Sequence, residues 1–387
     1  SGFEFVYAES LFDRHDPRER LGFERFLQRL DKVAGILVSE LGVFDSMSED
    51  SRETGFFKHG PGAVSNRRAS EYKYAFPYWS DKLEGLFPFD WCSGAALGAY
   101  PPSKVEKPSA LLTVPKTAKA PRLIAAEPVE HQWCQQKVKT WLDYAMKNSL
   151  VGRFFDPSNQ SLSQAMVASA SHDQRLSTLD LSSASDRVSC RHVEALFNAN
   201  KTLLAAVHAT RTRWIEDRVT TRDKLALRKF ASMGSALTFP VQSIFFLSVA
   251  LASAGAQCKR SIKRLVGKVR VFGDDIILPS YAYNDCVKYL GDLGLKVNRN
   301  KSFSKGFFRE SCGADCWGGF DVTPVKPKHV DADTPVGIQG LLDLANNLHL
   351  KGWWKAGEVV IGMLPPRFKR SVFRIGSGVP GLVSFAG

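Results

Sequence analysis

Residues 268–279 contain two short runs of β-branched and apolar residues that meet at Gly273-Asp274-Asp275. Such runs, joined by a Gly-Asp pair, are typical of a strand–turn–strand hairpin. Two ionised carboxylates about 4 Å apart repel each other by roughly 4 kcal/mol at an effective dielectric constant of about 20. A divalent cation offsets that repulsion, and aspartate oxygens suit Mg²⁺ or Mn²⁺. The hairpin alone is compatible with a solvated turn or with a metal site, and a third carboxylate in a similar setting favours the metal site.

A third carboxylate stands at the end of an upstream segment that resembles a strand. Ser177-Thr-Leu-Asp180 ends on an acid, and Ser183-Ala-Ser-Asp186 can open a helix that continues through 187–198. Adjacent strands of one sheet, each with an aspartate at the same end, would bring Asp180 and Asp274 together. Two metal ions about 3.5–4 Å apart, held by such aspartates, clamp an in-line phosphoryl displacement. The pattern therefore predicts phosphoryl-transfer chemistry.

Composition limits the class of protein and the partners to expect. Among 387 residues, 44% are hydrophobic and 24% are charged, and 52 Lys plus Arg against 39 Asp plus Glu give a formal charge of +13. These values predict a globular chain of two or three subdomains whose cations favour nucleic acid or an anionic membrane surface. The longest apolar run, 236–255, contains Pro240 and several serines and is predicted to be a buried helix rather than a membrane span. The scattered cysteines predict a reducing cytoplasm, and Cys312 and Cys316 lack the further ligands of a zinc site.

Other segments are assigned from the spacing of their apolar residues. Helices are predicted within 1–55, whose beginning matches neither a secretory signal nor a transit peptide, and in 130–147, 187–230, 283–293 and around 337–350. The segment 101–128, rich in Pro and Lys, is predicted to be an extended basic loop, and 295–303 a strand. In that loop Lys116, Lys119 and Arg122 would either line a channel for phosphates or remain solvated.

Four motifs occur in a single order along the chain: Leu179-Asp180-Leu-Ser-Ser-Ala-Ser-Asp186, Ser232-Met-Gly234, Val271-Phe-Gly-Asp-Asp-Ile-Ile-Leu-Pro-Ser280 and Phe308-Arg-Glu-Ser-Cys-Gly313. Together they closely resemble the replicase catalytic subunit of the single-stranded RNA bacteriophages, the levivirus group. The stretch from Val114-Pro-Lys116 to Glu127-Pro128 resembles the fingers motif of the same family. The resemblance covers roughly residues 110–325, is loose before them and is weakest at the C-terminal end.

The resemblance implies an α+β fold of the right-hand polymerase type, with fingers, palm and thumb and an antiparallel palm sheet flanked by helices. The sequence departs most from the family after 323, so the thumb is expected to be reduced. The expected division is fingers in 1–175 with the basic loop 101–128, a palm strand in 176–186, a fingers insertion in 187–230, the palm in 231–322 and the reduced thumb in 323–387.

The resemblance also assigns roles to individual residues. Two Mg²⁺ or Mn²⁺ ions would be bound by Asp180, Asp274 and Asp275, and Lys301 would act as a general acid beside them or be a plain surface lysine. Contacts to the incoming nucleotide would come from Lys116, Lys119, Arg122, Asp186, Ser235, Thr238 and Gln242. Asp186 would hydrogen-bond the ribose 2′-hydroxyl of the incoming nucleotide, directly or through neighbours, and so favour ribonucleotides. Contacts to RNA would come from Ser232, Gly234, Arg309, Glu310 and Ser311.

The function that the resemblance implies is RNA-dependent RNA polymerisation. Such an enzyme would replicate a positive-sense single-stranded RNA phage genome from NTPs in the host cytoplasm, with the template, the nascent RNA and host translation factors as partners and without a membrane. Three alternatives stay open: a replicase of a capsidless fungal or mitochondrial RNA virus, a reverse transcriptase and a non-catalytic RNA-binding protein. Phe308–Gly313 favours the phage group over the fungal one, small Ser183 and Ala184 argue against deoxyribose selection, and the three acids argue against a protein that only binds RNA.

Overall fold

The computed structural model describes residues 17–48, 57–66, 73–94, 102–114, 121–327, 330–369, 372–374 and 381–384. The chain folds into two compact units, 1–321 and 322–387. The described helices of the first unit are α2 (Pro17–Ser39), α4 (Asp81–Glu84), α5 (Phe89–Cys92), α6 (Val129–Lys147), α7 (Ser161–Asp173), α8 (Ala184–Arg187), α9 (Cys190–Leu196), α10 (Lys201–Thr210), α11 (Thr238–Ser253), α12 (Lys259–Lys263) and α13 (Tyr283–Asp292). Short 3₁₀ helices are η1 (Leu150–Arg153), η2 (Ser280–Ala282) and η3 (Arg299–Lys301).

The strands of the first unit, as far as it is described, form separate small sheets. One, here called the acid sheet, is antiparallel, has the order β3-β7-β6 and contains β3 (Leu176–Asp180), β7 (Asp275–Pro279) and β6 (Arg270–Phe272). A second, here called the mixed sheet, has the order β2-β1-β4-β5 and contains β2 (Arg122–Ala126), β1 (Ser109–Val114), β4 (Trp214–Asp217) and β5 (Lys224–Ala226), with β1 and β4 parallel. A third has the order β10-β9-β8, with β8 (Phe308–Ser311), β9 (Ala314–Trp317) and β10 (Phe320–Asp321).

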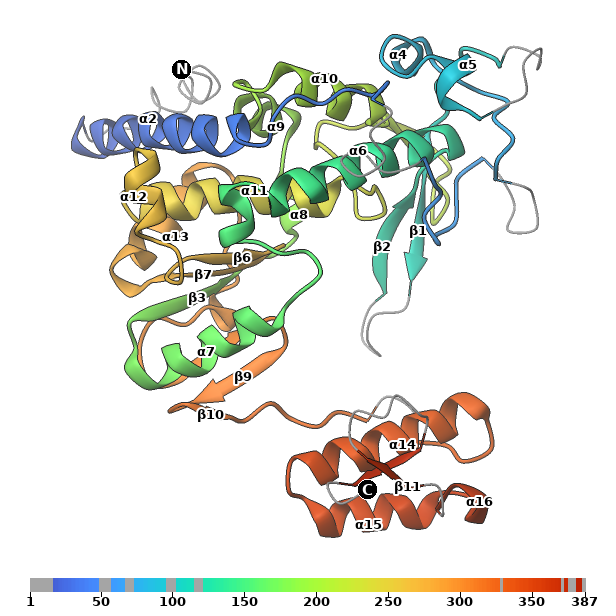
Figure 1. Ribbon diagram of the computed structural model, residues 1–387, viewed down its shortest axis with the longest axis vertical. Coiled ribbons are helices and arrows are strands. Elements are labelled where there is room, and N and C mark those ends of the chain that lie inside the picture. Colours follow the sequence, from blue (N-terminus) through green and yellow to red (C-terminus); the bar gives the residue numbers. More distant parts are fainter. Residues whose placement is uncertain are drawn as a thin grey trace. The chain divides into compact units, whose positions relative to one another are not determined.

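The acid sheet lies between helices on both of its faces, because its strands alternate their apolar side chains. Ile276 and Leu278 of β7 belong to the main core with α11, whereas Ile277 packs with Val167 of α7 and Cys316 of β9. α11 runs between α2 and the acid sheet in Figure 1 and is buried throughout apart from the half-buried Phe239. A helix that is apolar on all sides must be enclosed by protein. The predictions of a buried helix over 236–255 and of an α+β fold with an antiparallel sheet flanked by helices are confirmed.

The mixed sheet contains strands in two segments, 187–230 and 101–128, that were predicted to be a helix and an extended loop. The predicted helical segment 187–230 contains α9 and α10 but then forms the β4–β5 hairpin, because Trp214-Ile-Glu alternates at a strand period that a long helical window conceals. The predicted extended loop 101–128 contains β1 and β2, which pair antiparallel from Ala110–Ala126 to Val114–Arg122. Lys116 and Lys119 lie in the connection between them, outside the described residues.

The predicted strand 295–303 is also corrected. The chain there makes isolated bridges, Val297 with Leu181 and Phe303 with Thr178, and η3 separates the two. The predicted helices in 1–55, 130–147 and 283–293 are present as α2, α6 and α13.

The second unit is small and mainly helical. Its described elements are α14 (Pro335–Leu350), α15 (Trp354–Met363), α16 (Pro366–Lys369) and the parallel pair β11 (Val372–Arg374) and β12 (Leu382–Ser384). Thr334 caps α14 by accepting a hydrogen bond from the Gly337 N–H at 3.0 Å, and a compact apolar cluster joins α14 to α15. Across all described residues, no helix has both the length and the apolar composition that crossing a bilayer requires.

Candidate active site

The β6–β7 hairpin turns over Gly273 and Asp274. Gly273 has a φ of 64°, and a Cβ there would lie 2.7 Å from the Phe239 ring, so any other residue would strain this turn. Its N–H donates to the Ser243 hydroxyl at 3.1 Å. Both contacts come from α11, so the buried helix fixes the position of the turn.

Strand register brings the predicted acids to one end of the acid sheet. Asp180 of β3 pairs with Asp275 of β7, and Asp275 in turn pairs with Phe272 of β6. Asp274 immediately precedes Asp275 and lies at the exposed tip of the hairpin. The sequence predicted this convergence because each strand-like run ended or began at an acid.

The electrostatics of the site are those of acids crowded in a partly buried place. Burial, together with the negative charge of Asp274, raises the pKa of Asp275 to about 6, although hydrogen bonds from the Cys312 N–H and the Ser311 hydroxyl oppose the shift. Burial and the Asp274 charge also raise the pKa of Asp180, against a hydrogen bond from Asn298. A nearby cation would stabilise the ionised form of such partly buried carboxylates and lower their pKa.

The donor chemistry can be tested against the metal that the sequence predicts. All three acids offer hard carboxylate oxygens, which are the ligands that Mg²⁺ and Mn²⁺ prefer. Within the described ranges, no three His, Cys, Asp or Glu side chains converge closely enough to hold an ion as they stand. The chemistry of the donors fits a divalent cation, although the described side chains do not converge on one point.

Comparison with known proteins shows the family of this chain. Residues 93–371 match the family described as RNA replicase, beta-chain. The chain belongs to this family. The RNA-directed RNA polymerase beta chain of Escherichia phage MS2 is 33% identical over 273 residues, which are 70% of this chain and 45% of that protein. The corresponding beta subunit of Escherichia virus Qbeta is 31% identical over 286 residues, again 70% of this chain and 45% of that protein.

The chain thus spans about half the length of the curated relatives it matches. The resemblance to the single-stranded RNA bacteriophages, based on the order of four motifs, is confirmed. Among solved structures, the RNA-dependent RNA polymerase of a human picobirnavirus, as an insertion-loop deletion mutant, matches with a TM-score of 0.48 and 13% identity over 67% of this chain and 58% of that one.

A pair of opposite charges lies beside the acids of the acid sheet. Lys301, at the end of η3, donates to the Glu310 carboxylate at 2.9 Å. This hydrogen bond is the main reason why the pKa of Lys301 is raised, and the charges of Asp180 and Asp275 add to it. Glu310, predicted to contact RNA, therefore has a partner within the protein.

Asp186 lies on the short helix α8, just beyond β3. Its carboxylate accepts from the Lys229 ammonium at 2.6 Å. Lys229 belongs to the basic segment 187–230 and is joined to Ser189 by an isolated bridge. Sequence reasoning identified Asp186 but not this partner, because forty-odd residues separate them and nothing local signals the pair.

The Ser232-Met-Gly234 loop touches the mixed sheet. Ala125 of β2 donates its N–H to the Met233 carbonyl at 2.7 Å, and a Cβ on Gly234, whose φ is 120°, would overlap the Ala125 carbonyl oxygen. Ser232 is buried, and its carbonyl accepts from the Thr238 hydroxyl at 2.7 Å. The loop therefore joins the start of α11 to the strand that begins at Arg122.

The remaining residues that were predicted to contact nucleotide or RNA differ in their exposure to solvent. Arg122 is exposed, Ser235 is half-buried, and Gln242 is 8% exposed with an Oε1 that has no hydrogen-bond partner among the described residues. The prediction that Arg309 contacts RNA is corrected by its burial. Arg309 is fully buried, and its guanidinium donates to the backbone carbonyls of Leu176, Ser304, Gly306 and Phe308. Ser311 is likewise buried, at 1% exposure, and bonds to Asp275 rather than facing solvent.

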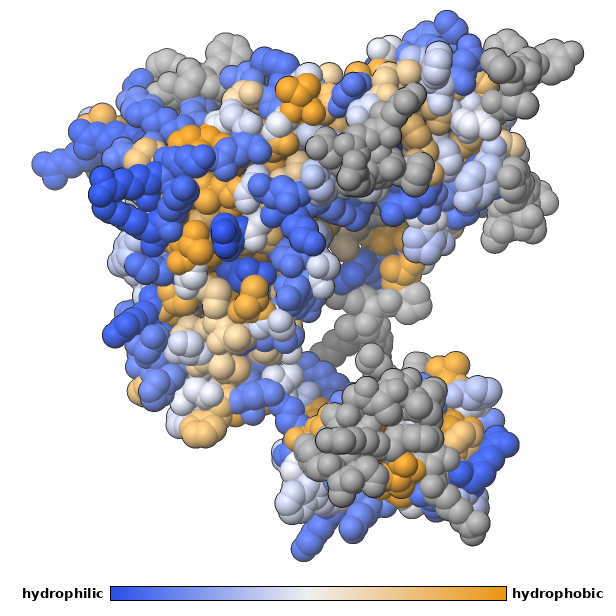
Figure 2. All heavy atoms as spheres, in the orientation of Figure 1, coloured by the Kyte–Doolittle hydropathy of each residue, from blue (hydrophilic) through white to orange (hydrophobic). Residues whose placement is uncertain are grey.

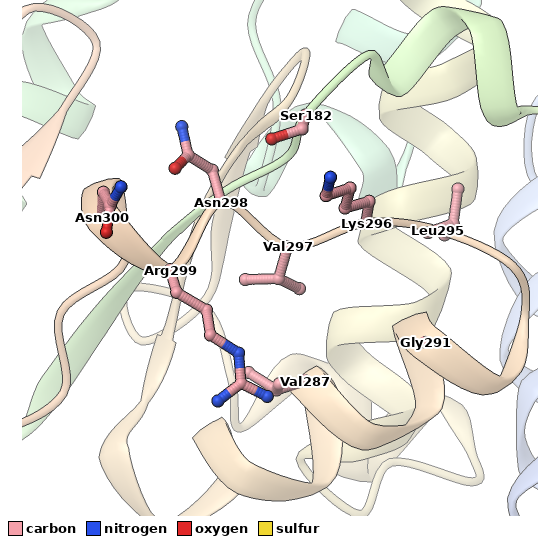
Figure 3. Close-up of a pocket in the computed structure, with 9 residues that line it drawn as sticks. All are labelled: Ser182, Val287, Gly291, Leu295, Lys296, Val297, Asn298, Arg299 and Asn300. Atoms are coloured by element: carbon pink, nitrogen blue, oxygen red, sulfur yellow. The ribbon is translucent and has the colours of Figure 1, made fainter.

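Figure 2 shows that hydrophilic residues cover much of the visible surface of the first unit, which is hollowed between the part that carries the acid sheet and the arm that carries β1 and β2. A cavity of about 560 Å³ lies next to the end of β3, between Ser182, α13 and residues 295–300. Figure 3 shows its lining, which includes Ser182, Lys296, Asn298 and Arg299. Asn298 belongs to this cavity and also bonds to Asp180, and sequence reasoning did not identify it.

Proposed function

We propose that this chain is the catalytic region of an RNA-dependent RNA polymerase that copies a positive-sense single-stranded RNA phage genome from NTPs. The observation that carries the proposal is the register that pairs Asp180 with Asp275 and leaves Asp274 at the tip of the hairpin. Family membership supports it, because the matching relatives are named as RNA-directed RNA polymerases.

In this proposal the elements correspond to a right hand. The acid sheet with α11 and α13 is the palm, and α7, expected among the fingers, is assigned to it as well because it packs on this sheet. The mixed sheet with the surrounding helices belongs to the fingers. Residues 323–387 form a reduced thumb. The fingers assignment explains why 187–230 returns to β1 through the parallel β4 after the chain has already passed through the palm.

Asp180, Asp274 and Asp275 would hold two Mg²⁺ or Mn²⁺ ions. When bound, such ions supply positive charge at the attacking 3′-hydroxyl and at the leaving oxygen of the α-phosphate. The chain itself contributes positioning, since the acids are fixed by strand register and by the turn that α11 holds. Lys301, kept protonated by Glu310, would donate a proton to the departing pyrophosphate.

Nucleotide selection would lie with residues around this centre. Arg122, with Lys116 and Lys119 of the adjoining connection, would bind the triphosphate as phosphate-seeking cations. Asp186 and the unpaired amide oxygen of Gln242 would bond to the ribose 2′-hydroxyl, which donates and accepts. Ser235 and Thr238 would shape the loop and helix start beside them.

The partners in this proposal are the template, the nascent RNA and NTPs, with host translation factors as additional partners in the host cytoplasm. The formal charge of +13 favours a polyanion. Release of counterions makes such binding fall steeply as salt rises. Binding that does not change between low and high salt would contradict a cationic RNA channel.

The decisive experiment incubates the purified chain with an RNA template, labelled NTPs or dNTPs, and Mg²⁺ or Mn²⁺. We expect NTP incorporation that Asp274→Asn or Asp180→Asn abolishes while RNA binding persists, because the acids act on chemistry rather than on affinity. Asp285→Asn, which changes an exposed acid on α13, is the matched control and should retain activity. Incorporation that persists in either variant would refute the metal assignment.

The same assay separates the alternatives. Preferential incorporation of dNTPs would indicate a reverse transcriptase. RNA binding without any incorporation, under both metals and with primed and unprimed templates, would indicate a protein that only binds RNA.

A further inference from the structure

β3 has two edges with different structures. One edge pairs with β7 continuously from Leu176 to Asp180. The other faces residues 297–303, here called the edge turn, which forms a bridge at each end but leaves the strand path at η3 between them. The ladder is therefore interrupted opposite the residue that carries the first acid.

One backbone bond and one side chain of the edge turn replace the missing ladder at Asp180. The Asn298 N–H donates to the Asp180 carbonyl at 2.8 Å, and the Asp180 N–H donates to the Ser302 hydroxyl at 3.1 Å. That hydroxyl in turn donates to the Asn298 carbonyl at 2.8 Å. The backbone of Asp180 is thus fully bonded without any help from its carboxylate.

One further bond reaches the carboxylate itself. The Asn298 amide Nδ2 donates to Asp180 Oδ2 at 2.8 Å. An ionised carboxylate only accepts hydrogen bonds, so the amide NH₂ must face it. This bond adds little to chain attachment, because the two bonds to the Asp180 backbone and the backbone bonds between Thr178 and Phe303 already hold the edge turn. Its specific effect is to fix the rotation of the carboxylate and to leave Oδ1 for another ligand.

From this geometry we infer that Asn298 is a positioning residue that orients the Asp180 carboxylate for a divalent cation. The inference rests on the proposed function, since it assigns a role toward the metal ions of that site. Hydrogen bonds that orient a ligand typically change metal affinity or activity by roughly 10- to 100-fold when removed.

The surroundings of Asn298 make the role testable without disturbing the core. The side chain is half-buried and borders the cavity of Figure 3, so truncation enlarges an existing space. Asn300, two residues along the same turn, is exposed, lines the same cavity and makes no bond to Asp180 in the described structure. It provides a matched control of the same residue type.

The experiment compares wild type with Asn298→Ala, Asn298→Leu and Asn300→Ala. Leu keeps the branching and the number of side-chain heavy atoms of Asn, is somewhat bulkier and removes the donor, so the two Asn298 variants separate loss of the side chain from loss of the bond. The first readout is Mn²⁺ titration of the protein without RNA or NTP, followed by the electron paramagnetic resonance signal of free Mn²⁺. The second is the Mg²⁺ concentration that gives half-maximal incorporation, and thermal unfolding checks that each variant is folded.

We expect both Asn298 variants to bind Mn²⁺ about 10-fold more weakly and to need correspondingly more Mg²⁺, with Asn300→Ala within about twofold of wild type. Saturating Mg²⁺ should restore incorporation in the Asn298 variants but not in Asp180→Asn, which lacks the ligand. Mn²⁺ affinities within twofold of wild type in both folded Asn298 variants would overturn the inference. A wild-type protein that makes no RNA would overturn the proposed function instead, and the Mn²⁺ titration would still decide the role of Asn298.

Discussion

The acid sheet and the mixed sheet carry opposite kinds of chemistry on opposite kinds of framework. In the acid sheet, β7 is buried from Ile276 to Pro279, and its acids stand at the strand end. In the mixed sheet, every residue of β5 is exposed, and Arg122 begins β2 with two exposed residues. Under the proposed function, the reacting groups belong to the buried sheet, whereas the groups that would bind a substrate belong to the exposed strands of the other.

The two sheets also differ in how their charges are balanced. Around the mixed sheet, cations have acidic partners, with Arg213 on Glu106 at 2.6 Å and Arg218 on Glu216 at 2.7 Å. The acids of the acid sheet instead lie together at one strand end, where burial and the charge of Asp274 raise the pKa of Asp180 and of Asp275. The Gly234 loop links the sheets, because it touches β2 and starts the helix that holds Gly273.

The largest expected effect is the break of that link by Gly234→Ala. The new Cβ would overlap a backbone oxygen that cannot move freely, and φ is unfavourable for any L side chain, so we expect a loss of about 3 kcal/mol or more in unfolding free energy. Gly255→Ala is the matched control, because its φ is also positive at 86° and nothing lies within 4 Å of the new atom. Urea unfolding of the control should show a loss of about 1 kcal/mol. Equal losses for the two variants would contradict a steric link between the sheets.

A smaller effect concerns the charge strain of the acid sheet. Because the pKa of Asp275 is raised to about 6, the folded state binds a proton more tightly than the unfolded state does. The unfolding free energy of wild type should therefore fall as pH rises through about 4 to 6, and the cost should be complete above that window. Without metal, Asp275→Asn should be more stable than wild type by about 2 kcal/mol at pH 7.5 and no different near pH 4.

Urea unfolding at several pH values, in chelator, measures this difference. Added Mg²⁺ should stabilise wild type but not the variant, since the ion needs the carboxylate. A difference between wild type and variant that does not depend on pH would show that Asp275 titrates normally.

Arg122→Gln sharpens the division between binding and chemistry. Loss of a cation that contacts the triphosphate equally in the ground state and the transition state should raise KM for NTP about 10-fold, with kcat within about twofold. Lys224→Gln, an exposed cation on β5 of the same sheet, should change KM little. Steady-state kinetics at fixed salt make the comparison, and a fall in kcat with KM unchanged would place Arg122 with the acids instead.

The smallest effect is expected from Lys229→Met. Lys229 holds the Asp186 carboxylate at 2.6 Å, and without it the acid should sample more orientations. A partly exposed ion pair of this kind contributes at most about 1 kcal/mol, so the preference for ATP over dATP in kcat/KM should fall about threefold. Arg228→Met, at the exposed neighbouring residue, should leave that preference unchanged. An unaltered preference in Lys229→Met would separate Asp186 from sugar selection.

The sequence was sufficient to predict the acid sheet because its signals are local. One apolar run ends at Asp180, and another begins at Asp275 after a glycine turn. These runs specify the β6–β7 hairpin and a neighbouring strand, β3, whose acid lies at the same end of the sheet. The buried α11 follows from its continuous apolar character in the same way.

The mixed sheet and the edge turn depend on contacts that no local pattern records. β4 finds its place by pairing with β1, more than a hundred residues earlier, so its short alternation was absorbed into a helical window. Residues 295–303 have the composition of a strand, but Asn298 and Ser302 bond to Asp180 and draw the chain out of the ladder. Arg309 looks like a surface cation until the carbonyls that surround it are known.

The pairing of Asp180 with Asp275 restricts how the lengths of these strands can change. Successive residues of a strand point to opposite faces, so inserting or deleting a single residue between 176 and 180 would shift the partner of every residue in the segment and exchange its two faces. Leu179, in the main core with α11, and Leu176, packed on the α7 side, would exchange faces, and both burials oppose that exchange. The segment can accept altered side chains one at a time, but its residue count is fixed by geometry.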